Sequence, residues 1–172
     1  MSECDYTTPG FVPAIKQDKS MACWVTCGTM MRSWKDNQVY SIDEFKRALG
    51  APYDIYYDTN SGLTLNDLAP FARATGLSVE PPQNPSITGW RDYLRAWGPL
   101  FVVTAELAYP TLFGVHARIL IAMKGDCNPN ATQMTLIDPD SGVQSDLNFS
   151  DFLSVFENLA GASPPAFQIL HW

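Results

Sequence analysis

The sequence has few of the groups that build a metal site or a nucleic-acid surface. Only two histidines accompany its four cysteines, and no paired C-x-x-C spacing is present, which disfavours a zinc site. Eleven Lys and Arg residues stand against eighteen Asp and Glu residues, for a net charge of −7. Nucleic-acid affinity depends on clustered basic side chains, so this balance disfavours a nucleic-acid partner. We therefore expect no metal, no other cofactor and no nucleic acid.

Long apolar runs are also missing. No stretch of eighteen apolar residues is present, and the first residues lack the basic, apolar and small-residue order of a general secretory signal. We expect neither a membrane span nor a membrane partner. Without such a signal, reduced thiols are the default, so Cys4 and Cys127 are expected to be unpaired residues in loops.

The composition is that of one folded domain. The chain has 172 residues, of which 46% are hydrophobic and 17% charged, values typical of a globular protein that buries a core without covalent staples. We expect a single domain over residues 1–172.

Helix signals dominate the first hundred residues, after an extended lead-in over residues 1–16. Apolar residues recur from Cys23 to about Lys35 as in a largely buried helix. Ser41 and Thr64 begin N-terminal capping patterns, and glycines supply the stops. Residues 53–61 are polar and aromatic and indicate a loop. The predicted helices are 23–35, 41–49, 64–75 and 90–97.

Strand signals follow Gly98 and Pro99. Short runs of apolar and β-branched residues have strand length, and one late helix is expected from a Ser150 cap to Gly161. The chain is therefore α+β, with a helical lobe over about 14–98, an antiparallel sheet lobe over about 99–172 and an active site between them. The predicted strands are 100–104, 115–123, 134–137 and 166–170.

The residues around Cys23 can form a reactive thiol. Cys23 opens a predicted helix, and the free N–H groups and dipole of a helix N-terminus favour a thiolate, which is the nucleophilic form. Gln17 precedes it by six positions and can donate to an oxyanion. Trp24 should pack beside the nucleophile and contact substrate. Cys27 lies one turn further on, and we favour a packing role over a redox pair.

A base and an orienting carboxylate follow in the sheet half. His116 enters a predicted strand, and Asp138 ends the next one. In chain order, Cys23 would attack a carbonyl, His116 would carry the proton and Asp138 would orient the imidazole. Arg118 shares a strand face with His116 and could bind a substrate carboxylate, although a surface ion pair is favoured. His171 is expected at a surface strand end and is the only spare base.

These residues resemble those of papain-like cysteine peptidases of the compact bacterial kind. The spacing of Gln17, Cys23 and Cys27 is similar to that of peptidases that remove double-glycine leaders from bacteriocins. Cys23-Trp24, followed by His116-Ala-Arg and Asp138-Pro139, is similar to papain-fold effector proteases that bacteria inject into other cells. The resemblance spans about residues 12–157. Papain itself has Cys-Gly-Ser-Cys-Trp around the nucleophile and an orienting asparagine, so this chain departs from it at both places.

The resemblance implies a cysteine protease with a papain-like two-lobe fold that cuts protein substrates through an acyl-thioester, with the option of a cut after Gly-Gly. It also implies a bacterial toxin or effector of interbacterial competition. Such a protein would be made in the bacterial cytoplasm, delivered into the target-cell cytoplasm by a specialised apparatus such as type VI secretion, and inhibited by a cognate immunity protein over the active site.

Two alternatives stay open from the sequence. The same thiol chemistry could serve an amidase, a deamidase or a transglutaminase-type acyl transferase. The fold could also be kept without chemistry, as a binding module.

Overall fold

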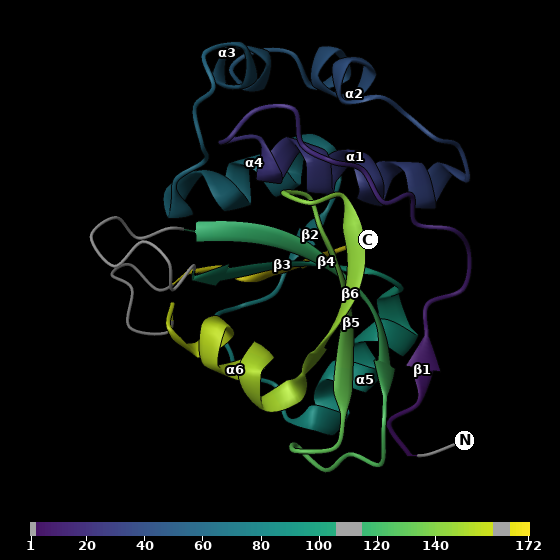
Figure 1. Ribbon diagram of the computed structural model, residues 1–172. Coiled ribbons are helices and arrows are strands. Elements are labelled where there is room, and N and C mark those ends of the chain that lie inside the picture. Colours follow the sequence, from purple (N-terminus) through teal and green to yellow (C-terminus); the bar gives the residue numbers. More distant parts are fainter. Residues whose placement is uncertain (1–2, 106–114, 160–165) are drawn as a thin grey trace.

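A computed structural model describes residues 3–105, 115–159 and 166–172 of the chain (Figure 1). These residues form a sheet with helices on both of its sides, so the predicted α+β class is confirmed. The strands are β1 (Tyr6–Thr7), β2 (Ser78–Val79), β3 (Leu100–Ala105), β4 (Val115–Lys124), β5 (Gln133–Asp138), β6 (Val143–Asn148) and β7 (Ile169–His171). The helices are α1 (Cys23–Asp36), α2 (Ile42–Leu49), α3 (Tyr53–Asp58), the 3₁₀ turn η1 (Leu65–Asp67), α4 (Leu68–Thr75), α5 (Ile87–Trp97) and α6 (Phe149–Glu157).

All of the described strand pairs are antiparallel, in the order β2-β7-β3-β4-β5-β6. The short strand β1 pairs with the far end of β4, where it continues the line of β3. The central position of β4 and β5 matters for function, because His116 lies on β4 and Asp138 ends β5.

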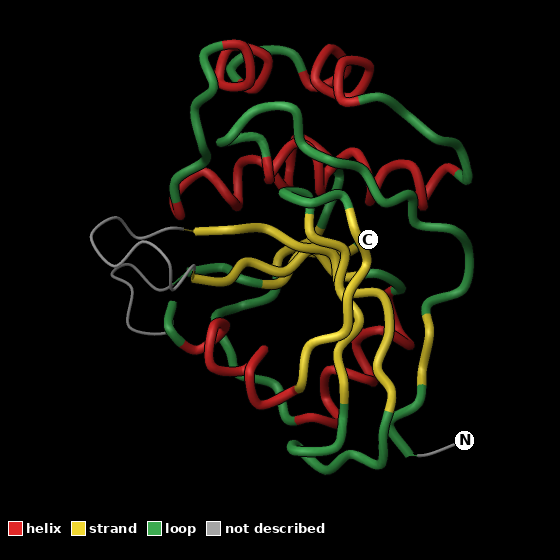
Figure 2. The backbone as a smooth tube through the Cα atoms, in the orientation of Figure 1, coloured by secondary structure: helices red, strands yellow, loops and turns green. Residues whose placement is uncertain are grey.

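Two apolar cores lie on opposite faces of this sheet. Helices α1 to α4 cover one face, and α5 and α6 cover the other (Figures 1 and 2). Alternate residues of β3 enter different cores: Phe101 and Val103 face α1, whereas Leu100 and Val102 face α5. The division into two lobes near residue 98 stays a prediction. No helix in the described parts is both long and apolar enough to cross a membrane.

The ends of α2 and of η1 with α4 follow the predicted capping chemistry. Ser41 caps α2 in a capping box with Glu44, and Gly50 follows its last residue. Thr64 makes the equivalent box with Asp67 at η1, which continues into α4, and Gly76 at φ 80° ends α4. Local backbone hydrogen bonding therefore accounts for these boundaries.

The structure corrects several predicted elements. Residues 53–61 are not simply a loop, because α3 occupies the first six of them. Strand β6 was not predicted. The cap of α6 is Asn148 rather than Ser150, since the Asn148 side chain accepts from the Ser150 N–H. Strand β7 is shorter than predicted and starts at Ile169, and the predicted stop at Gly161 lies outside the described residues.

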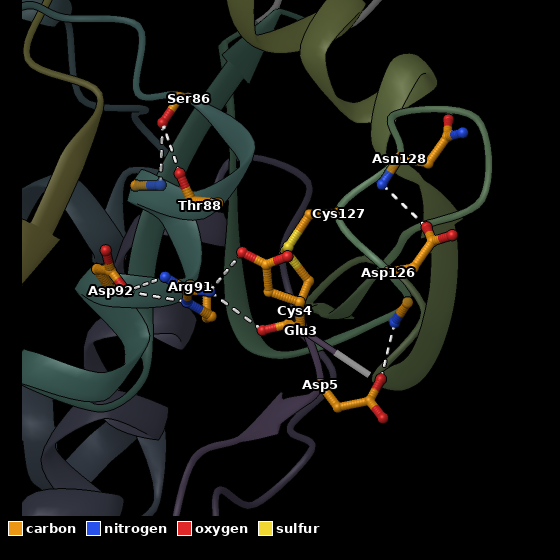
Figure 3. Close-up of a disulfide and its surroundings, with 12 residues drawn as sticks. Glu3, Cys4, Asp5, Ser86, Thr88, Arg91, Asp92, Asp126, Cys127 and Asn128 are labelled. Carbon is orange, nitrogen blue, oxygen red and sulfur yellow. Dashed lines mark hydrogen bonds and ion pairs between the residues drawn. A yellow bond between two sulfur atoms is a disulfide. The ribbon is translucent and has the colours of Figure 1, made fainter. Parts of the chain in front are cut away.

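Cys4 and Cys127 form a disulfide, so the prediction of two unpaired loop thiols is wrong (Figure 3). The bond joins the N-terminal segment to the turn between β4 and β5. The N–H of Cys4 donates to Gly125 at 3.0 Å, and Arg91 of α5 donates to the Glu3 carbonyl at 3.1 Å. The two cysteines meet because β1 pairs with β4, a long-range contact that short-range patterns do not encode.

His171 is buried instead of lying at the surface, which corrects a second prediction. Its ring stacks on Trp97 with centroids 3.7 Å apart, and its Nε2 lies 3.0 Å from Glu80 Oε1. Both the face and the edge of the His171 ring are therefore used in the packing of β7.

Candidate active site

Cys23 is the first residue of α1, as the sequence predicts, and it is half-buried with a free thiol. The N-cap residue is Ala22, whose side chain makes no capping hydrogen bond. The first N–H groups of a helix have no partner within the helix and carry the positive end of its dipole. The start of α1 is therefore suited to hold negative charge on sulfur or on an oxygen beside it.

The loop that leads into Cys23 is fixed by α3 and the turn after it. The hydroxyl of Tyr57 donates to Asp18 at 2.5 Å, and Lys19 donates to the Tyr57 carbonyl at 2.9 Å. The N–H of Met21 donates to the Asn60 side chain at 3.0 Å. These contacts show why α3 matters to the site, although no sequence motif indicated it; two buried tyrosines at i and i+4 were the available signal.

Gln17 joins this loop to the sheet. Its backbone N–H donates to the carbonyl of Pro139 at 2.7 Å, directly after Asp138. Gln17 is 8% exposed, and its Nε2 donates one hydrogen bond to the Ser20 carbonyl at 3.1 Å. A primary amide has two N–H donors, so one remains for another acceptor. The buried Oε1 has no hydrogen-bond partner among the described residues.

His116 lies near the start of β4 and contacts two of the other predicted residues. Its Nε2 is 2.8 Å from Asp138 Oδ1. Burial of the imidazole opposes its protonation, but hydrogen bonds to Asp138 and to the Cys23 thiol outweigh burial and raise the pKa of His116 to about 9. Because Nε2 is used by Asp138, the thiol contact falls to Nδ1. The imidazole therefore lies between sulfur and carboxylate.

The Asp138 carboxylate accepts three hydrogen bonds. Oδ1 accepts hydrogen bonds from His116 Nε2 and from the backbone N–H of Asp140, the latter at 2.9 Å. Oδ2 accepts one from Arg118 Nε at 2.8 Å. Burial opposes the charge of Asp138, but the bond from His116 and the positive charges of His116 and Arg118 hold its pKa well below the usual range. The carboxylate thus stays ionised and fixed. The half-buried Arg118 is not the surface ion pair that we expected.

The neighbours of Cys23 on α1 have packing roles in the described structure. Cys27 is fully buried, and burial, followed by the nearby Cys23, raises the pKa of its thiol. This agrees with packing rather than redox chemistry. Trp24 is 2% exposed, packs edge-on against Phe71 and donates from Nε1 to Ser61 at 3.3 Å. A direct contact of Trp24 with substrate stays a prediction.

The structure therefore brings Gln17, Cys23, His116 and Asp138 together from α1, its leading loop and two strands. Among the described residues, no group of three or more His, Cys, Asp or Glu side chains could hold a metal ion. Residues 7–157 match the model of one protein family, described as papain-like cysteine protease AvrRpt2. The chain belongs to this family.

Membership of the papain-like cysteine protease AvrRpt2 family makes the chain a papain-like cysteine peptidase, with a mixed helix and antiparallel-sheet fold. It also places the chain on the effector-protease side of the predicted resemblance. No individual curated protein matches the chain significantly.

Two residues of the site escaped the sequence analysis. Thr104 on β3 accepts a hydrogen bond from Arg118 Nη1 at 2.7 Å, and Asn60 holds the loop before Cys23. Thr104 had no sequence signal, because its partner lies fourteen residues away on the neighbouring strand. Asn60 follows α3 with a positive φ of 52°, a conformation for which asparagine is favoured, and this was its only local mark.

Proposed function

We propose that the peptidase uses Cys23 as nucleophile, His116 as general acid and base, and Asp138 as the residue that orients the imidazole. The observation that carries this proposal is the hydrogen-bonded series from the Cys23 thiol through His116 to Asp138. A thiol, an imidazole and a carboxylate in this order form the arrangement that activates a nucleophile for acyl transfer.

In the proposed reaction, the Cys23 proton has already passed to Nδ1 of His116, and the resulting thiolate attacks the carbonyl carbon of the scissile peptide bond. The carbonyl oxygen becomes an oxyanion that accepts the second Nε2 hydrogen of Gln17 and the N–H of Cys23. His116 then returns the proton to the leaving amine, the C–N bond breaks, and an acyl-thioester remains. Water, deprotonated by His116, attacks the thioester and releases the acid product and the thiol.

The test is cleavage of proteins in a target-cell lysate, followed by mass spectrometry of the new termini. Cys23→Ala should abolish cleavage by more than about 10³-fold, because it removes the bond-forming atom, while leaving the fold intact. Cys27→Ala is the matched control on the same helix and should keep full activity per folded molecule. Cleavage by the Cys23→Ala protein would reject the assignment.

An amidase, deamidase or transglutaminase reaction remains the rival within thiol chemistry. These reactions release ammonia from a side-chain amide and leave the backbone intact. Measuring ammonia and new N-termini in the same incubation separates the two classes. Ammonia release without backbone cleavage would support the rival.

A narrower proposal concerns the substrate residues that precede the cut. The spacing of Gln17 and Cys23 is similar to that in double-glycine leader peptidases. This spacing supports a preference for Gly-Gly or another small pair. Large residues at the mapped cut sites would contradict it.

We also propose that the chain acts as a bacterial effector or toxin, delivered into the cytoplasm of a target cell by a specialised secretion system. Its family is one of effector-type proteases, which supports this proposal. A cognate immunity protein over the site would protect the producer. Co-expression of the neighbouring coding sequence from the source genome tests this last part, and unaltered toxicity and cleavage would count against it.

A further inference from the structure

Arg118 shares a face of β4 with His116. It contacts Asp138 and Thr104, which each contact His116. Its Nε donates to Asp138 Oδ2 at 2.8 Å, and its Nη1 donates to the Thr104 hydroxyl at 2.7 Å. Thr104 lies directly opposite His116 in the pairing of β3 with β4, and its hydroxyl donates to the His116 carbonyl at 3.4 Å. The contacts therefore run from the His116 backbone through Thr104, Arg118 and Asp138 back to the His116 ring.

This closed series has a geometric consequence. Asp138 Oδ1 serves His116, and Oδ2 is held by Arg118, so rotation of the carboxylate would break one of these two bonds. The guanidinium is itself fixed, because it is planar and spans groups from β3 and β5. A lysine has one nitrogen and cannot span the same two acceptors with that geometry.

The series also has an electrostatic consequence. Arg118 adds a positive charge next to the ionised Asp138, which favours the carboxylate, and it lies close enough to His116 to oppose the second positive charge on the imidazole. Arg118 thus limits the extent to which Asp138 and Cys23 raise the pKa of His116. Loss of the charge and loss of the bridging geometry should therefore have different effects.

We propose that Arg118, anchored by Thr104, is a positioning residue of the peptidase that fixes the Asp138 carboxylate and thereby the His116 ring toward Cys23. This inference rests on the roles proposed above for those three residues. It replaces the substrate-carboxylate role considered from sequence, because two of the guanidinium nitrogens are already engaged by the protein.

Three variants separate the geometry from the charge. Arg118→Lys keeps the charge but cannot bridge Asp138 and Thr104. Arg118→Gln removes the charge as well. Thr104→Val keeps the shape of the fully buried anchor and removes its hydroxyl. Arg91→Gln is the matched control, since Arg91 is a similarly covered arginine, 14% against 20% exposed, that contacts Glu3 and Asp92 instead.

The first measurement needs no substrate. Alkylation of Cys23 by iodoacetamide is followed by mass spectrometry of its peptide between pH 5 and 11, with Cys27 as the buried internal reference. The second measurement is kcat and KM, expressed per alkylatable Cys23 so that partial unfolding is corrected. Both are repeated for Arg118→Lys in an Asp138→Asn background.

We expect Arg118→Lys and Arg118→Gln to lower kcat about 10- to 100-fold with KM within about twofold, the size of loss typical of a misplaced catalytic group. Only Arg118→Gln should move the alkaline limb, the change in rate on the high-pH side, to higher pH in both the alkylation profile and the kcat profile. Thr104→Val should lower kcat less, and Arg91→Gln should change neither kcat nor the limb. In the Asp138→Asn background, Arg118→Lys should add less than about twofold, because the carboxylate contact is already weakened.

Three results would overturn the proposal. Variants within twofold of the wild type in kcat and pH profile would show that Arg118 has no influence on the hydrogen-bonded series from Cys23 through His116 to Asp138. A rise in KM at constant kcat would assign Arg118 to substrate binding. Fully additive losses with Asp138→Asn would indicate a general structural role. In each case rapid, selective alkylation of wild-type Cys23 would leave the proposed function standing, whereas an unreactive wild-type Cys23 would reject both.

Discussion

At the scale of single residues, the protonation of His116 decides the working pH. Burial lowers the pKa of the imidazole, but Asp138 and Cys23 raise it to about 9, above the ordinary value of 6.5. An imidazolium is therefore present at neutral pH, where it can stabilise a thiolate and protonate a leaving amine. The associated contribution to folding stability is complete below pH 6.5 and is lost as the pH rises through about 9.

This leads to a pH prediction. We expect kcat/KM to fall as the pH rises through about 9, because His116 then loses the proton that the leaving group needs. Asp138→Asn should move this limb to lower pH, since the bond to Asp138 is the first contact that raises the pKa of His116. Initial rates on a peptide substrate in buffers of constant ionic strength measure the alkaline limb of the wild type and of the variant. An alkaline limb near pH 6.5 in the wild type would contradict the prediction.

At the scale of elements, the N-terminal segment runs from the Cys4–Cys127 disulfide to the active site. The Cys4–Cys127 disulfide and the pairing of β1 with β4 hold its start, and the Gln17 N–H bond to Pro139 holds its end. The segment is thus fixed at both ends, and its far end carries the proposed oxyanion donor. The position of Gln17 depends on the sheet as well as on α1.

Reduction of the disulfide gives the second prediction. Cys4→Ser combined with Cys127→Ser should lower the free energy of unfolding by about 2–5 kcal/mol, because the bond closes a very long loop in the unfolded chain. Urea denaturation with and without a dithiol reductant measures this. The double variant is the control, since reductant should not change its stability. Equal stability of oxidised and reduced wild type would contradict the prediction.

The activity of the reduced protein bears on the proposed destination. Cytosolic thiol buffers keep most cysteines reduced, so a protein acting in a target-cell cytoplasm would work without this bond. Activity retained in the reduced wild type is therefore expected, with Gln17 still held by Pro139.

At the scale of the whole molecule, only one of the two cores supports the start of α1. Helices α5 and α6 pack on the face away from α1 (Figure 1). There Phe152 lies edge-on to Trp90 with ring centroids 5.1 Å apart. The opposite core contains Phe71, which packs against Trp24, the residue after Cys23. Damage to the two cores should therefore affect function differently.

The third prediction compares these cores. Phe152→Ala and Phe71→Ala should each destabilise the fold by about 3–5 kcal/mol, the range for a large aromatic removed from a core. Only Phe71→Ala should also lower kcat per alkylatable Cys23, because the cavity lies under the start of α1. Thermal unfolding and single-turnover kinetics measure the two effects. A comparable loss of kcat in Phe152→Ala would show that both cores position the site equally.

Local signals in the sequence predicted much of the fold and the composition of the site. Capping boxes at Ser41 and Thr64, and the apolar spacing after Cys23, act within a few residues and were correct. The exposed edge strand β6 was missed because its residues do not alternate between apolar and polar. Helix α3 was missed because it is less than two turns long. Such elements depend on contacts with distant segments.

By itself, the sequence determined that a cysteine begins a helix, that a histidine begins a strand and that an aspartate ends the next one, because these follow from short-range hydrogen bonding and apolar spacing. Only the tertiary structure decided that Arg118 and Thr104 join them, that Cys4 meets Cys127, and that His171 is buried against Trp97. The reason is physical: each of these contacts depends on strand pairing and helix packing between residues far apart in the chain, where the sheet register sets which side chains face one another.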